Sequence, residues 1–210
     1  MNMAIDIDAL RPAAPTEASE AEPALKRRVA GFGFWIFLLS DVVMFSALFA
    51  TYAVLAHATA GGLGGNQLFS QRNVALETGC LLMSSFTCGL MSMAAHSRRR
   101  SAFHLGAIAT FALGAVFLGL ELGEFGDMVA RGATPQSSAF LSAFFALVGC
   151  HGLHVAAGLV WLAVMGAQVA IRGFRDVVDR RLLCFSLFWH ALDIVWVAVF
   201  TFVYLMGVRA

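Results

Sequence analysis

The amino-acid sequence predicts an all-α protein, a polytopic membrane bundle of five transmembrane helices. Three observations lead to this prediction. Hydrophobic residues make up 60% of the 210 residues and charged residues only 13%, which is far from the composition of an ordinary soluble domain. The apolar residues form long continuous blocks, and the Lys and Arg residues gather beside alternate ends of these blocks.

Each apolar block has the length of a membrane-spanning helix. Such a helix needs roughly 20 consecutive apolar residues. Five blocks meet or approach that length, at residues 32–56, 73–95, 102–124, 138–170 and 182–207. A transmembrane β-barrel would instead show short segments of alternating polarity. We therefore expect five helices that cross the membrane.

The N-terminal segment differs from the rest of the chain. Its first 25 residues combine Ala, Pro and acidic residues without helical periodicity. We expect residues 1–28 to form a cytosolic, largely disordered tail and residues 29–210 to form the transmembrane domain. The apolar block after Arg28 is longer than the core of a cleavable signal peptide, which has about 7–15 residues.

The positive charges predict the orientation. Eleven of the 14 Lys and Arg residues precede the first block, follow the second or lie between the fourth and fifth, whereas only Arg72, Arg131 and Arg209 lie on the other side. Because Lys and Arg concentrate in cytoplasmic loops, we expect a cytoplasmic N-terminus and a C-terminus outside the cytoplasm.

The connecting segments offer no familiar catalytic motif. They contain no Gly-rich phosphate loop, no nucleophile elbow and no CxxC pattern. The cysteines lie within the apolar blocks, where we expect reduced packing residues: Cys80, Cys88, Cys150 and Cys184. Any chemistry must therefore occur within the bundle or in a partner, and we expect no nucleic-acid partner.

Four acidic residues within the blocks are candidates for a polar or proton-linked role, because ionisable groups are costly in a membrane. Asp41 lies near the middle of the first block, where it is either a neutral acid bonded to another helix or proton-linked. We expect Glu77 at the outer interface and partly hydrated. Glu121 and Glu124 lie on one helix face and could share a proton or bind a cation. We expect interfacial solvation for Glu124, and Glu121 is the better functional candidate.

Three histidines and one aspartate form a second candidate group. His151 and His154 are three residues apart, as are His190 and Asp193, so that each pair can project from one side of its helix. This spacing permits a His–carboxylate network between helices. It equally permits haem ligation by His residues that face each other across a bundle.

Three separated segments resemble one family. They are WIFLLSD at residues 35–41, FLSAFFALVGCHGLHV at residues 140–155 and LFWHALDIVW at residues 187–196. Together they resemble subunit III of the haem–copper respiratory oxidases, and the five-block length resembles the cytochrome o ubiquinol oxidase branch of that family. The cytochrome c oxidase branch commonly has seven spans, and this chain resembles the last five.

The resemblance implies an accessory subunit of a proton-pumping terminal ubiquinol oxidase in the bacterial inner membrane, with a periplasmic C-terminus. In that family the haems and copper belong to subunit I, so it implies no cofactor on this chain and structural roles for the histidines. Asp41 matches an acidic position of the family, and Glu121 and Glu124 match its paired acids. The expected partners are subunit I as the main contact, subunits II and IV, and bound phospholipid.

Three alternatives stay open from the sequence. The first is subunit III of a cytochrome c oxidase. The second is a b-type membrane cytochrome that uses His151 or His154 together with His190. The third is a proton-coupled transporter with Asp41 and Glu121 as carriers, although no inverted repeat is visible.

Overall fold

Long helices account for nearly all of the chain that the computed structural model describes, which comprises residues 17–61 and 71–205. They are α1 (Glu17–Leu55), α3 (Gln71–His96), α4 (Arg100–Ala130), α5 (Ala139–Arg172) and α6 (Asp176–Val199), and α6 continues into the π-helix η2 (Phe200–Leu205). Within the described residues, five segments are long and apolar enough to cross a membrane: Gly31–Leu55, Gln71–His96, Arg100–Ala130, Ala139–Arg172 and Asp176–Leu205. The predicted fold class and the five predicted spans are confirmed.

Helix α1 begins well before the membrane-spanning segment. Residues 17–28, which we expected to belong to a tail with little structure, form the first turns of α1. This stretch contains Glu, Ala, Leu and Lys, which favour helix, and the apolar block that follows extends the same helix. The rest of the expected tail, residues 1–16, and the last residues of the fifth block, 206–207, lie outside the described residues.

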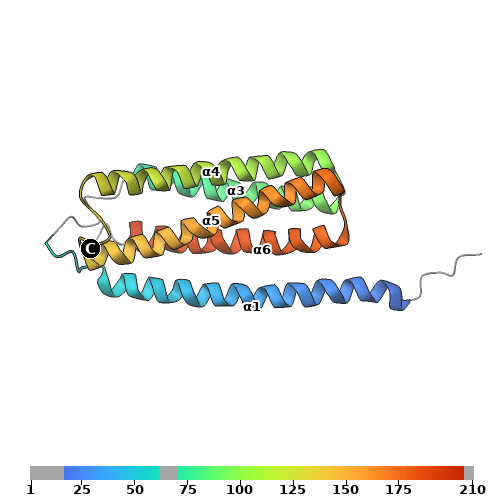
Figure 1. Ribbon diagram of the computed structural model, residues 1–210, viewed down its shortest axis with the longest axis horizontal. Helices are drawn as coiled ribbons and strands as arrows, with labels where there is room; N and C mark the ends of the chain where they lie inside the picture. Colours follow the sequence, from blue (N-terminus) through green and yellow to red (C-terminus); the bar gives the residue numbers. More distant parts are fainter. Residues whose placement is uncertain (1–16, 62–70, 206–210) are drawn as a thin grey trace, which may run out of the picture.

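Consecutive helices run in opposite directions (Figure 1). The turn between α3 and α4 and the turn between α5 and α6 lie at the same end of the bundle, which we call the arginine-rich end because its two turns carry Arg98, Arg99, Arg175 and nearby arginines. Arg98 adopts a left-handed conformation with φ of 55°, so the chain reverses within a few residues. Its guanidinium forms a salt bridge of 2.9 Å with Asp179 at the start of α6, which links the two turns.

Small residues allow the inner helices to approach closely. A Cβ atom added at Gly106 of α4 would lie 2.9 Å from the Cβ of Met91 on α3, and one added at Gly158 of α5 would lie 2.7 Å from the Trp189 ring of α6. Helix association in membranes depends on such packing, because lipid provides no hydrophobic driving force between helices. The small residues therefore set the distances at which polar side chains on neighbouring helices meet.

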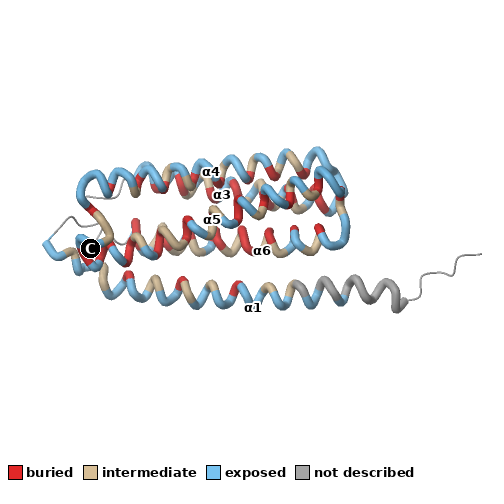
Figure 2. The backbone as a smooth tube through the Cα atoms, viewed as in Figure 1, coloured by how far each residue is buried: buried red, intermediate tan, exposed pale blue. Residues whose placement is uncertain are grey.

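Helix α1 lies at the edge of the bundle, where it contacts α5 and α6 (Figure 1). Figure 2 shows α1 mostly exposed, with a narrow buried stripe on the side that faces the other helices. This stripe includes Leu38, Phe45 and Tyr52, which are spaced seven residues apart. The outer face of α1 presents large apolar side chains, among them Phe32 and Trp35, so this face is suited to lipid or to another membrane protein.

Candidate functional site

Three carboxylic acids lie together in the interior of the bundle. They are Glu77 of α3 and Glu121 and Glu124 of α4, with relative exposures of 0%, 2% and 8%. Helices α3 and α4 are antiparallel and closely packed, and the hydroxyls of Thr87 and Thr110 meet across them at 2.8 Å. This register brings Glu77 to the level of the other two acids, and the three groups are close enough to repel one another when charged. We call these three residues the carboxyl cluster.

The π-helix η2 places a tyrosine against this cluster. The Tyr204 hydroxyl donates a hydrogen bond of 3.4 Å to Oε2 of Glu124. Tyr204 is 3% exposed and comes from the end of the α6 helix, far from Glu124 in sequence. A π-helix turns its side chains relative to a regular α-helix, and such segments occur frequently at functional sites. The tyrosine closes the cluster on the side of α6.

Helix α5 covers the cluster on another side, through a glycine. A Cβ atom added at Gly152 would lie 2.9 Å from Oε1 and 3.1 Å from Oε2 of Glu121. The Glu121 carboxyl group therefore occupies the space that a side chain at position 152 would need. Glycine at this position lets α5 pack directly on a polar group of α4.

The chemistry that this arrangement permits is proton sharing. No oxygen of Glu77 or Glu121 accepts a hydrogen bond from a described residue. Charged carboxylates without a partner are very costly in an apolar interior, and like charges this close raise the cost further. Such a group of acids can hold protons in common.

Two of these acids are more buried than the sequence suggested. We expected Glu77 to be partly hydrated and Glu124 to be solvated at the interface, but both side chains are buried. The reason is that α3 and α4 pack closely on each other, and Tyr204 of η2 lies against Glu124. Glu121 is buried, as its deeper position suggested.

A second polar region follows the contact between α3 and α6. Trp189 Nε1 donates a hydrogen bond of 2.9 Å to Ser84 Oγ, and Trp196 Nε1 donates one of 3.1 Å to Thr78 Oγ1. The Ser85 hydroxyl and His190 Nδ1 are 2.7 Å apart. These bonds join residues more than 100 positions apart in sequence, and we call them the polar seam. They satisfy indole and imidazole groups that would otherwise be unpaired in the membrane.

Asp193 belongs to the same seam. It is 7% exposed and lies close to Ser85 and Cys88 of α3, although neither carboxyl oxygen makes a hydrogen bond of normal geometry to a described residue. His190 and Asp193 thus face the same helix, as their spacing permits. The partner of His190 in the structure is a serine and not a carboxylate.

The two histidines of α5 have different surroundings. His151 is fully buried among aromatic rings, with centroid distances of 5.1 Å to Trp196 and 5.7 Å to Phe117, and neither ring nitrogen bonds to a described residue. His154 is half-buried, and its Nδ1 donates to the Cys150 carbonyl of its own helix at 2.7 Å. The packed rings around His151 provide side-chain contacts rather than space for a macrocycle.

Asp41 stands apart from the carboxyl cluster. It is half-buried on α1 and lies close enough to the Cys150 thiol of α5 for an electrostatic interaction. Its neighbour Phe45 packs edge-on against His154, with the ring centroids 5.3 Å apart. Asp41 therefore lies at the contact between α1 and α5.

Several residues of these regions were not expected from the sequence. Tyr204, Gly152 and the hydroxyls of Thr78, Ser84 and Ser85 complete the cluster and the seam. The sequence does contain one feature that could have predicted the hydroxyls, because Ser and Thr recur along one face of α3 at Thr78, Ser85 and Ser92.

In the part of the chain that the structure describes, no three His, Cys, Asp or Glu side chains are arranged to hold a metal ion.

Comparison with known proteins identifies the family. The family model described as cytochrome c oxidase subunit III matches residues 22–208, which include all five spans. The chain belongs to the cytochrome c oxidase subunit III family. This subunit III is 52% identical over 176 residues to cytochrome bo(3) ubiquinol oxidase subunit 3 of Pseudomonas aeruginosa, with 84% of each chain covered.

Two further relatives agree with this assignment. This subunit III is 49% identical to the cytochrome bo(3) ubiquinol oxidase subunit 3 of Pseudomonas putida, over 84% of this chain and 85% of the relative. It is 45% identical to quinol oxidase subunit 3 of Bacillus subtilis, over 83% of this chain and 86% of the relative. The family resemblance of the three sequence segments is confirmed.

Proposed function

We propose that this chain is the accessory subunit III of a terminal ubiquinol oxidase, which reduces oxygen to water and pumps protons. The observation that supports this most directly is the 52% identity to a subunit 3 of a ubiquinol oxidase over 84% of both chains. The geometry agrees with a non-catalytic role, because the polar groups of the polar seam are engaged between the chain's own helices. The chain stabilises the complex and does not itself react with quinol or oxygen.

The redox centres of the complex belong to subunit I, in this proposal. The chain packs mainly against subunit I, and subunits II and IV are further partners. The exposed apolar faces, such as that of α1, offer the area for these contacts and for bound phospholipid. His190 is held by Ser85, and His154 by its own helix, which favours structural roles for both histidines over haem ligation.

The candidate site residues divide into two groups. Asp41 and the carboxyl cluster of Glu77, Glu121 and Glu124 are the proton-linked candidates. The three acids of the cluster are buried and close enough to repel one another when charged. His151, His154, His190 and Asp193 have structural roles in the packing of the helices, and among them His190 bonds to Ser85 of α3. Asp41 supports sustained proton uptake by the complex from its place beside α5.

The proposed location is the bacterial inner membrane, with the N-terminus in the cytoplasm and the C-terminus in the periplasm. The concentration of arginines at the α3–α4 and α5–α6 turns supports this orientation. The N-terminus and these turns would then share the cytoplasmic side, and Arg72 and Arg131 would lie on the periplasmic side.

Purification of the complex through a tag on this chain tests the proposal. We expect native mass spectrometry to find the chain with larger oxidase subunits, and the sample to oxidise ubiquinol rather than reduced cytochrome c. Preference for cytochrome c would assign it to the other oxidase branch. A haem spectrum from the isolated chain that disappears in His190→Ala would identify a b-type cytochrome, and substrate-driven proton flux in liposomes would identify a transporter.

A further inference from the structure

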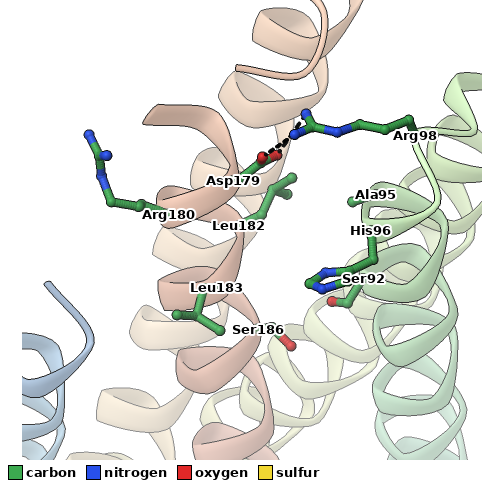
Figure 3. Close-up of a pocket in the computed structure, with 9 residues that line it drawn as sticks. All are labelled: Ser92, Ala95, His96, Arg98, Asp179, Arg180, Leu182, Leu183 and Ser186. Atoms are coloured by element: carbon green, nitrogen blue, oxygen red, sulfur yellow. Dashed lines mark hydrogen bonds and ion pairs between the residues drawn. The ribbon is translucent and has the colours of Figure 1, made fainter. Parts of the chain in front are cut away.

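The two ends of the bundle differ in how near water can come to the carboxyl cluster. At the arginine-rich end, a cavity of about 240 Å³ lies between α3 and α6 and is lined by the Arg98–Asp179 salt bridge, among other groups (Figure 3). Ser92 is the residue of its α3 wall that lies nearest to the cluster in sequence. It is 15 residues from Glu77, about 22 Å along the helix. Water in this cavity therefore stays well short of the cluster.

The carboxyl cluster lies near the opposite end of the bundle. Glu77 comes six residues after the start of α3, and Glu124 comes six residues before the end of α4. At about 1.5 Å per helical residue, each of them is roughly 9 Å from the end of its helix. Asp127, one turn beyond Glu124, is an exposed charged residue, as expected close to a membrane surface. The aqueous boundary thus lies about one helical turn from the cluster.

Packed aromatic rings close the cluster on the side of the membrane centre. Phe117 lies one turn before Glu121 on α4 and packs edge-on against Trp196 of α6, with the ring centroids 4.7 Å apart. His151 of α5 contacts both rings, at 5.7 Å and 5.1 Å, and all three side chains are at most 1% exposed. We call Phe117, His151 and Trp196 the aromatic layer. Because such close packing leaves little room for water, this layer separates the cluster from the middle of the bundle.

Tyr204 covers the cluster near the end of α6. It is one residue from the end of η2, and its hydroxyl donates to Oε2 of Glu124 over 3.4 Å, a length at which a hydrogen bond is weak. Its ring packs on Phe144 of α5 and on Trp196, with centroid distances of 6.2 Å to each. The other two acids of the cluster also lie close enough to act on Tyr204 electrostatically. Tyr204 therefore faces all three acids.

The π-helix gives Tyr204 a way to move. Segment η2 departs from the regular geometry of α6 directly before its end. A π-helix has more residues per turn than an α-helix, so a return of η2 to α-helical geometry would rotate Tyr204 away from Glu124. This movement breaks one weak hydrogen bond. It leaves the aromatic layer in place, because Trp196 precedes η2.

We propose that Tyr204 gates proton exchange between the carboxyl cluster and water at the end of the bundle opposite the arginines. In the closed arrangement, its hydroxyl bonds to Glu124 and its ring covers the acids. When the ring turns out, water reaches Glu124 and a proton from water replaces a carboxyl proton, so that the charge of the cluster does not change. The inference rests on the proton-linked role proposed for the cluster. In the proposed orientation, the gate opens toward the periplasm.

Infrared spectroscopy of the purified complex after transfer to D2O measures this exchange. The C=O stretch of a protonated carboxyl group shifts when deuterium replaces the proton, and the band that is lost in Glu121→Gln identifies the cluster. Tyr204→Phe keeps the ring and removes the hydroxyl that holds the gate closed. We expect exchange at the cluster to become faster by about two- to tenfold, which corresponds to the loss of one hydrogen bond.

Two variants provide matched controls. Tyr52→Phe removes the hydroxyl of the other tyrosine of the chain, which is 4% exposed on α1 and packs against Phe140. Phe117→Leu loosens the aromatic layer on the side of the membrane centre. We expect both variants to exchange at the wild-type rate, because neither changes the contact between Tyr204 and Glu124.

The remaining outcomes each decide against the gate. Equal exchange rates in Tyr204→Phe and the wild type overturn the proposal, as does a Glu121→Gln spectrum with no missing band, since the acids would then be ionised. Equal acceleration in either control also overturns it, because exchange would then follow another route. If Tyr204→Phe fails to assemble, Phe144→Leu loosens the packing on the Tyr204 ring and must accelerate exchange. Subunit composition and ubiquinol oxidation of the same samples report separately on the proposed function.

Discussion

The carboxyl group of Glu121 lies directly against the backbone of Gly152, so that a Cβ atom added at Gly152 would be only 2.9 Å from Oε1. Glu121 and Gly152 belong to different helices, α4 and α5. Gly152 has a helical backbone that any residue could adopt, so the conformational freedom of glycine is not needed at this position. It makes room for a buried carboxylic acid.

Gly152→Ala should lower the stability of the assembled complex, because overpacking costs about 1–3 kcal/mol. An alanine would otherwise favour a helix over glycine by about 1 kcal/mol. Gly149→Ala, one turn away, is the control, because the nearest atom to its added Cβ is 3.7 Å away, an ordinary contact. Thermal dissociation of the purified complex measures both. Equal stability of the two variants would show that Glu121 can move aside freely.

Glu121→Gln should leave assembly intact and keep or raise the stability of the complex. The amide has the shape of the acid but cannot ionise, so it removes one member of three mutually repelling groups. Asp127→Asn on the exposed side of the same helix should change stability little. Measurement of complex yield and thermal dissociation checks the prediction. A large loss with Glu121→Gln alone would mean that the cluster needs a negative charge, for example to hold a cation.

Ser84→Ala should destabilise the bundle, because the Trp189 indole would lose the acceptor of its 2.9 Å hydrogen bond in a fully buried site. An unpaired buried donor costs about 1–3 kcal/mol. The control is Ser46→Ala, since the Ser46 hydroxyl donates only to the Val42 carbonyl of its own helix on an exposed face. Thermal dissociation should distinguish the two serines, and equal midpoints would argue against a role for the polar seam in stability.

Asp41→Ala should leave assembly largely intact and reduce the number of turnovers before the oxidase fails. Asp41 is only half-buried at the edge of the bundle, so its removal leaves little packing defect. The measurement is oxygen consumption followed to inactivation at equal complex content. Its neighbour Ser40, whose hydroxyl donates to the Phe37 carbonyl, provides the control Ser40→Ala. An unchanged lifetime in Asp41→Ala would leave Asp41 as a packing residue.

Asp193→Leu should impair assembly of the complex. The leucine would place an apolar side chain against the Ser85 hydroxyl and the Cys88 thiol at the α3–α6 contact. These two groups would then lose the Asp193 carboxyl group as a polar neighbour. Ile194→Leu is a suitable control, because Ile194 is 72% exposed on the outer face of α6. Quantification of assembled complex in membranes tests this. Wild-type levels with Asp193→Leu would be incompatible with the prediction.

The fold can be predicted from the sequence because few backbone structures are stable for an apolar chain inside a membrane. A block of apolar residues such as 102–124 must satisfy its backbone hydrogen bonds internally, so it forms a helix. The number of spans and the three family segments were therefore available from the sequence. The helix from Glu17 to Arg28 could not be predicted in the same way. The composition of this segment shows that it is polar, but it does not show whether the neighbouring helix continues through it.

The contacts within the candidate site join residues on different helices. Residue spacing along one helix cannot predict such contacts. The sequence paired Glu121 with Glu124, and His190 with Asp193, because these residues share helix faces. Only the register of α3 against α4 brings Glu77 to the carboxyl cluster, and only the antiparallel contact of α3 with α6 gives His190 its partner Ser85.

The membrane class, the five helices, the family and the identity of the polar residues within the spans can all be inferred from the amino-acid sequence. Which of these polar residues contact one another depends on how the helices pack. The physical reason is that hydrophobicity and backbone hydrogen bonding act locally along the chain, whereas the contacts of a buried polar group depend on how closely two helices approach. In this subunit III, that approach is set by glycines such as Gly152, whose effect appears only when the neighbouring helix is in place.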